Sequence, residues 1–190
     1  MTMTDRVARP ADIALMAGVI LLLRRMRSDL DRTGRLRRGT RIGIWTAYAA
    51  FGALLTDTLV RHGHEVPVGQ RTAGYAVAAA GATLAGAGMA SFTGPEQLNG
   101  GKTGDLITSG IYAYSRHPQY AGFIAAATGL AAARGSDRAA FLATELAVTL
   151  RVWASIEEVH LKRQFGAAYE RVCRRVPRWI GIPSSAGSAG

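Results

Sequence analysis

The sequence predicts an all-α fold: a polytopic membrane helical bundle of about five transmembrane helices, followed by a C-terminal helix in the cytoplasmic interface. Two observations support it. The apolar residues gather in blocks with almost no charge inside them, and the basic residues fill the gaps between the blocks. The blocks are 11–23, 42–60, 73–92, 120–133 and 139–156. A helix is the natural spanning element because it satisfies its own backbone in lipid. A soluble globular enzyme is not expected.

Three of the blocks have the length of a full membrane crossing. Blocks 42–60, 73–92 and 139–156 hold 19, 20 and 18 residues, and a helix rising about 1.5 Å per residue needs roughly 20 to cross the hydrocarbon core. The first and fourth blocks are short. Snorkelling of Arg24 and Arg25 lengthens the first, which we interpret as a retained segment because it lacks a signal-peptide cleavage site. The fourth begins in the His117-Pro118 stretch.

Two local patterns predict how the blocks pack. Small residues recur at helical spacing along the third block, at Gly74, Ala78, Gly81, Ala85 and Gly88. Such residues let helix backbones approach closely in lipid, so we interpret them as a packing face. The polar stretch 134–138 predicts a tight turn, which makes the fourth and fifth blocks a helical hairpin.

The basic residues predict the orientation. The chain has 23 Lys and Arg, 21 of them Arg, against 13 Asp and Glu, for a net charge of +10. Connectors 24–41, 93–117 and 157–190 carry sixteen of the basic residues, and 1–10, 61–71 and 134–138 carry six. The positive-inside rule then places the N-terminus outside and the C-terminus in the cytoplasm. Basic residues beside apolar blocks indicate membrane lipids as partners. We expect no nucleic-acid partner and see no sign of an obligate protein partner.

The last part of the chain is amphipathic. Apolar residues follow helical spacing at Leu161, Phe165, Ala168, Val172 and Val176, with arginines on another face. This pattern predicts a helix lying in the cytoplasmic interface with its rings toward the lipid. We expect one domain over 1–182, with its catalytic half at about 93–180 and a disordered tail at 183–190.

Polar groups gather where the fourth block begins. Arg116 and His117 precede Pro118, a residue favoured at the first position of a helix. The free amides of a first turn, a guanidinium and an imidazole together suit a carboxylate or phosphate. Local chemistry leaves two interpretations open, a ligand site and an anchor for lipid phosphate.

A second polar group lies at the end of the fifth block. Arg151 and Glu158 are seven residues apart, nearly two helical turns, and so share a face, with Glu157 beside them. An Arg inside an apolar segment is costly and is by default a functional candidate. The alternative is an internal Arg–Glu pair that fixes helix packing.

We expect no metal site. His62 and His64 form a two-histidine loop without a plausible third ligand, and Cys173 is the single cysteine. One cysteine excludes an intramolecular disulfide and a site with several thiolates.

Two motifs follow one another in the second half of the chain. The first is Gly110-x-Tyr112, then Arg116-His117-Pro118-x-Tyr120-x-Gly122; the second is Glu157-Glu158-x-x-Leu161-x-x-x-Phe165-Gly166-x-x-Tyr169, then Val176-Pro177. In this order on a multi-span chain they resemble the signature of the isoprenylcysteine carboxyl methyltransferase superfamily, which includes bacterial phospholipid N-methyltransferases. The resemblance covers roughly residues 100–180 and is limited to hydropathy over 1–92.

The resemblance implies an integral membrane methyltransferase that uses S-adenosylmethionine and releases S-adenosylhomocysteine. The residues that it assigns to the cofactor are His117, Pro118, Gln119, Tyr120, Glu157 and Glu158, with Tyr112 and Gly122 shaping the pocket. Arg116 and His117 suit the cofactor's carboxylate, and the Glu pair, Tyr120 or Trp153 suits its sulfonium. An arginine of the family pattern, one turn before the Glu pair, is replaced here by Trp153 or Ala154. Arg151 is the candidate to take over its catalytic role.

Three functions stay open from the sequence. The first is methylation of a lipophilic carboxylate, such as an isoprenoid or prenylcysteine-like lipid, which needs an Arg to hold it and no base. The second is methylation of a phospholipid amine, for which a Glu such as Glu158 is the candidate base. The third is a membrane module that binds lipid or assists another protein without catalysis.

Overall fold

The computed structural model describes residues 10–92, 94 and 105–184. In these residues the chain forms six α-helices and one 3-10 helix, and no strand: α1 (Pro10–Thr33), α2 (Arg38–Arg61), α3 (Val68–Ala90), η2 (Gly110–Ala113), α5 (Pro118–Arg134), α6 (Asp137–Phe165) and α7 (Ala167–Arg175). The predicted all-α class is confirmed.

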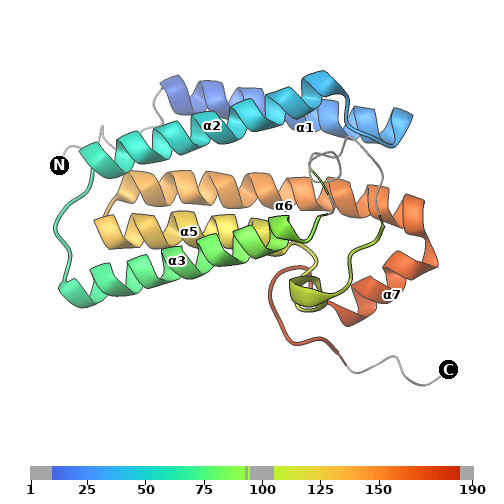
Figure 1. The fold of residues 1–190 in the computed structure, drawn as a ribbon. Coiled ribbons are helices and arrows are strands. Elements are labelled where there is room, and N and C mark those ends of the chain that lie inside the picture. The colour runs from blue at the N-terminus through green and yellow to red at the C-terminus, as the bar shows by residue number, and fades with distance from the viewer. Residues whose placement is uncertain (1–9, 93, 95–104, 185–190) are drawn as a thin grey trace.

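The long helices form a bundle with α6 in its middle (Figure 1). The α1–α2 hairpin lies on one side of α6, and α5 and α3 lie on the other. Arg138 at the start of α6 binds the buried Asp12 at the start of α1, with Nη2 2.7 Å from Oδ1. Helices α1 and α6 therefore run parallel, and α2 runs antiparallel to both.

The connectors alternate between two ends of this bundle. The turns after α2 and α5 meet at one end, where the His64 amide donates to the Arg134 carbonyl oxygen (3.0 Å). The opposite end holds the α1–α2 turn, residues 105–117 and α7, and we call it the α7 end. The described parts of the more basic connectors all lie at the α7 end.

Helices α3 and α5 pack with almost no side chains between them. The buried residues of α3 are Gly74, Ala78, Gly81, Ala85 and Gly88, the five small residues that the sequence predicts as a packing face. A Cβ on Gly81 would lie 2.5 Å from the Ala126 nitrogen, and one on Gly122 would lie 2.4 Å from the Ala85 nitrogen. This close approach fixes the position of α5, whose first turn carries the polar residues described below.

Adding a single methyl group at this contact should push the two helices apart. We expect Gly81→Ala to lower the free energy of unfolding by about 1–3 kcal/mol, because a backbone atom cannot move aside as a side chain can. Gly86→Ala is the matched control on the same helix, since a Cβ there meets nothing within 4 Å. Thermal unfolding in detergent compares the two variants, and equal melting temperatures would contradict the packing role.

The ends of α5 follow local sequence signals. Pro118 is its first residue, as predicted. At its other end Gly135 adopts a left-handed conformation, with φ of 56°, which only glycine adopts without strain. The Ser136 hydroxyl then caps α6 by accepting from the Ala139 amide (3.2 Å). The predicted α5–α6 hairpin is confirmed.

Three of the described helices are long and apolar enough to cross a membrane: α2, α3 and α6. Less than half of each apolar stretch is buried inside the bundle, which leaves side chains of all three helices open to lipid. The other two predicted spans do not qualify. Helix α5 has only 17 residues, and the second half of α1 carries Arg24, Arg25, Arg27, Asp29 and Asp31. Three apolar helices are thus found where the sequence predicts about five crossings.

The C-terminal amphipathic segment differs from the expected single helix. Gly166, with φ of 51°, separates α6 from the nine-residue α7. The apolar residues Tyr169, Val172 and Val176 are buried against protein, packed with Leu106 and Leu161. The apolar face predicted to lie toward the lipid is therefore covered by the chain itself at Val172 and Val176. Of the predicted tail 183–190, residues 185–190 lie outside the described residues.

Candidate active site

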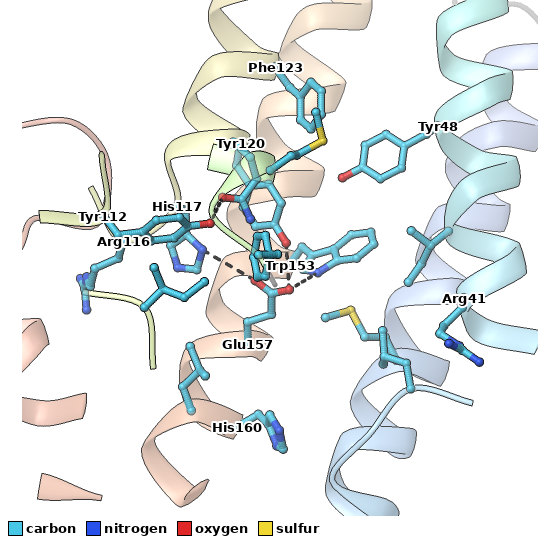
Figure 2. A pocket seen from close by; sticks show the side chains of 18 of the residues that line it. Arg41, Tyr48, Tyr112, Arg116, His117, Tyr120, Phe123, Trp153, Glu157 and His160 are labelled. Atoms are coloured by element: carbon cyan, nitrogen blue, oxygen red, sulfur yellow. Dashed lines mark hydrogen bonds and ion pairs between the residues drawn. The ribbon is translucent and has the colours of Figure 1, made fainter. Parts of the chain in front are cut away.

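A cavity of about 710 Å³ lies between the α1–α2 hairpin and the α5–α6 hairpin, toward the α7 end. Its polar wall comes from the start of α5, from η2 and from the second half of α6 (Figure 2). Its apolar wall includes Met26, Leu30, Ile44, Phe51, Leu55 and Leu146. The volume lies within the roughly 300–1,000 Å³ of pockets that enclose a small organic ligand.

His117 is fixed at the first turn of α5. Its side chain is 3% exposed, its backbone amide donates to the Ser115 hydroxyl (3.2 Å), and its ring stacks on Tyr120 at 5.4 Å between centroids and 7° between planes. The preceding amide, of Arg116, donates to the Pro177 carbonyl oxygen (3.0 Å). The C-terminal segment therefore holds the α5 start in place.

Glu157 presents a carboxylate to the cavity. Its Oε1 accepts from the Tyr120 hydroxyl (2.8 Å) and from the Trp153 indole N–H (2.9 Å). Among the described residues its Oε2 has no hydrogen bond; the nearest charged partner is His117 Nδ1 at 3.7 Å. With 32% of the side chain exposed in a cavity wall, this oxygen is available to a cation inside the cavity.

Glu158 is placed quite differently from its neighbour. Its side chain is 8% exposed and does not line the cavity. Arg178 donates hydrogen bonds to both carboxylate oxygens, from Nε to Oε1 (3.0 Å) and from Nη2 to Oε2. Arg116 Nη1 and His117 Nε2 lie 3.4 and 3.3 Å from Oε1. The hydrogen bonds to Glu158 raise the pKa of Arg178. Glu158 is thus the centre of a buried ion cluster behind the cavity wall.

This arrangement divides the roles of the two glutamates. The side chains of Glu157 and Glu158 leave the helix about 100° apart, so His117 contacts both, Nδ1 toward Glu157 and Nε2 toward Glu158. Glu158 is already occupied by two guanidiniums, and the direct role expected of it in the site stays a prediction. Glu158 positions His117, which lies against the cavity.

Tyr112 and Gln119 form a second polar pair in the cavity wall. The Tyr112 hydroxyl donates to Gln119 Oε1 (2.7 Å). Burial raises the pKa of Tyr112 well above its usual range, so the hydroxyl keeps its proton and remains a donor. Pro118 and Gly122 are buried but do not line the cavity. Pro118 begins α5, and Gly122 allows α3 to pack closely against that helix.

Aromatic rings surround the space beside Glu157. Tyr48 of α2 lies 5.6 Å from Phe123 and 6.1 Å from Trp153 between ring centroids, and Tyr120 lies 6.2 Å from Trp153. Figure 2 shows these rings together with the carboxylate facing the same space. Ring faces and a carboxylate together attract an organic cation.

Arg151 is not part of this arrangement. It is exposed on α6 and does not line the cavity, so the structure does not support the catalytic role expected from its spacing to Glu158. The two do share a helix face, as predicted. The C-terminal segment covers that face at Glu158, where Arg178 binds, and leaves it open at Arg151.

Three site residues were not predicted: Arg41, Tyr48 and Arg178. Arg41 and Tyr48 lie in the half of the chain where only hydropathy was informative. Arg178 directly follows the Val176-Pro177 motif, and its place beside this motif was the signal that could have identified it as a site residue. Among the described residues, no group of three or more His, Cys, Asp or Glu is placed to hold a metal ion.

Comparison with known proteins identifies the family. A family model described as phospholipid methyltransferase matches residues 70–168, more than half of the chain. The chain belongs to the phospholipid methyltransferase family. The match contains α3 except for its first two residues, and all of η2, α5 and α6. It leaves out the α1–α2 side of the cavity.

A relative supports the same superfamily. The protein-S-isoprenylcysteine O-methyltransferase of Schizosaccharomyces pombe (strain 972 / ATCC 24843) is 39% identical over 84 residues, which are 41% of this chain and 33% of the relative. The chain thus spans about a third of the length of that relative. No solved structure matches the chain significantly. The resemblance inferred from the two motifs is confirmed, and family and apolar helices together indicate an integral membrane protein.

Proposed function

We propose that the protein is a membrane methyltransferase that transfers a methyl group from S-adenosylmethionine to the carboxylate of a lipophilic acceptor, such as an isoprenylcysteine. The observation that carries this proposal is the position of the Glu157 carboxylate in the cavity wall. This carboxylate is held by Tyr120 and Trp153 and keeps one oxygen toward an aromatic-lined cavity. Such a site suits a sulfonium, which is an organic cation.

The residues present fit the cofactor. The cavity is large enough for a nucleoside with an amino-acid chain. Glu157, Tyr48, Tyr120 and Trp153 would hold the sulfonium, and the Tyr112–Gln119 pair offers further polar groups. When bound, S-adenosylmethionine supplies an electrophilic methyl group on its sulfur and leaves as S-adenosylhomocysteine. The protein's contribution is a rigid site of low polarity that aligns donor and acceptor.

The apolar wall of the cavity supports a lipophilic acceptor. Met26, Ile44, Phe51 and Leu55 line the cavity from α1 and α2, so a lipid tail can be buried beside the carboxylate that is methylated. A carboxylate attacks through its own oxygen and needs no general base. The relative's name, an isoprenylcysteine O-methyltransferase, favours this acceptor class.

The alternative is methylation of a phospholipid amine, which the family description favours. An amine must lose a proton before it attacks. Glu157 would then be the candidate base, because Glu158 is occupied by two arginines.

We further propose that the bundle lies in the membrane with its α7 end in the cytoplasm and its N-terminus outside. The excess of basic residues in the connectors of the α7 end supports this orientation. Helices α1 and α5 would complete five crossings, with Arg24 and Arg25 of α1 snorkelling to the head groups. Residues 1–182 would then form one domain.

The proposal is tested with purified protein in nanodiscs, methyl-labelled S-adenosylmethionine and N-acetyl-S-farnesylcysteine. We expect labelled product that releases methanol in alkali, as a methyl ester does. Label that is stable to alkali and found in the phospholipids would support the amine alternative. No transfer to either acceptor would contradict the proposed function.

A further inference from the structure

Arg41 brings an unpaired positive charge to the cavity from outside the residues matched by the family model. It lies in the first turn of α2 and lines the cavity, and Figure 2 shows it on the side opposite the polar wall. Within the described residues its side chain has no hydrogen bond and no ion pair, and its Nε is buried without a partner. A half-buried guanidinium in this state favours an anionic ligand.

The other arginines near the cavity are already in ion pairs. Arg116 and Arg178 both bind Glu158. Among the described residues that line the cavity, Glu157 and Asp105 are carboxylates, and Glu157 has one oxygen without a hydrogen bond. An anionic ligand brought beside Glu157 is repelled unless a cation compensates. Of the two arginines that line the cavity in the described part of the chain, Arg41 is the one without an ion pair.

The helix geometry places Arg41 close enough to serve this purpose. Tyr48 of α2 and Trp153 of α6 lie at the same level, 6.1 Å apart between ring centroids. Arg41 precedes Tyr48 by seven residues and His160 follows Trp153 by seven. Because α2 and α6 are antiparallel, these two residues share a level two turns nearer the α7 end. Glu157 lies about one turn from this level, on the side away from the α7 end. A long Arg side chain covers such an offset.

We propose that Arg41 binds the carboxylate of the lipophilic acceptor and thereby selects anionic over amine acceptors. This inference rests on the proposed function, since it names the acceptor-binding residue of the same cavity. It assigns acceptor choice to the α1–α2 hairpin, whereas the residues facing the sulfonium lie mainly on α5 and α6.

Binding of two ligands that differ only in charge tests this assignment. The probes are N-acetyl-S-farnesylcysteine and its carboxamide, titrated into detergent-solubilised full-length protein saturated with S-adenosylhomocysteine. We expect the wild type to bind the carboxylate about tenfold or more tightly than the carboxamide, the value of one charge-assisted contact. Arg41→Gln should remove that preference, and Arg41→Lys should restore part of it. Arg38→Gln, an exposed arginine outside the cavity wall, is the control and should behave as wild type.

The affinity for S-adenosylhomocysteine separates the two carboxylates that Arg41 could hold. An unchanged affinity in Arg41→Gln assigns Arg41 to the acceptor. A weakened affinity would assign it to the cofactor's own carboxylate and overturn the proposal, as would a carboxylate preference that survives in Arg41→Gln. Turnover is recorded separately. A wild-type preference without methyl transfer would refute the proposed function and leave the binding role of Arg41 intact.

Discussion

Glu157→Gln is expected to weaken binding of S-adenosylmethionine much more than binding of S-adenosylhomocysteine. The first ligand carries a sulfonium charge and the second a neutral thioether, so only the first loses an attraction. We expect its Kd to rise about tenfold or more, with that of the thioether changed less than about threefold. Methyl transfer should fall by about a hundredfold or more, as when another fixed electrostatic contact is removed. Calorimetric titration of both ligands measures the difference.

The choice of glutamine keeps the local structure. Its amide oxygen still accepts from Tyr120 and Trp153, the two donors that hold Glu157 Oε1. The melting temperature should therefore remain near that of the wild type. Equal losses for both ligands would show that Glu157 shapes the pocket rather than facing the sulfonium.

Glu158→Ala is expected to act on stability instead. Removing this carboxylate leaves Arg116, Arg178 and His117 without their common partner, and a broken buried pair costs about 3–5 kcal/mol. Thermal unfolding in detergent should show a large fall in melting temperature, accompanied by weaker cofactor binding because His117 loses its position.

The exposed Glu170 of α7 provides the matched control. Glu170→Ala removes the same group from the same end of the protein and should change the melting temperature little. Arg178→Ala should destabilise less than Glu158→Ala, because Arg116 and His117 then still contact the carboxylate. A wild-type melting temperature in Glu158→Ala would contradict the buried-cluster role.

These two predictions rest on a distinction that the sequence does not contain. Adjacent glutamates in a motif look equivalent, and only the surrounding chain decides that Glu157 faces the cavity while Glu158 faces Arg178. Arg151 illustrates the same limit. Its spacing correctly predicts the face that it shares with Glu158, but what covers that face depends on the path of the C-terminal segment.

Other features could be predicted from the sequence because one physical cause dominates each of them. Small residues at helical spacing in an apolar block have one strong use, close helix packing, and Gly74 to Gly88 are buried against α5 as predicted. Pro118 at a helix start and Gly135 at a helix end are equally local signals. The residues that α2 contributes to the cavity could not be predicted, because the sequence of an apolar helix does not show which face packs against which partner. Arg41 and Tyr48 were therefore missed.

Titration of the purified wild-type protein with S-adenosylmethionine and S-adenosylhomocysteine tests the central claim most directly. The claim is that the cavity beside Glu157 and His117 binds this cofactor. It predicts one saturable site per chain for each ligand, with binding that raises the melting temperature. A helical, cooperatively unfolding sample that binds neither ligand would contradict it.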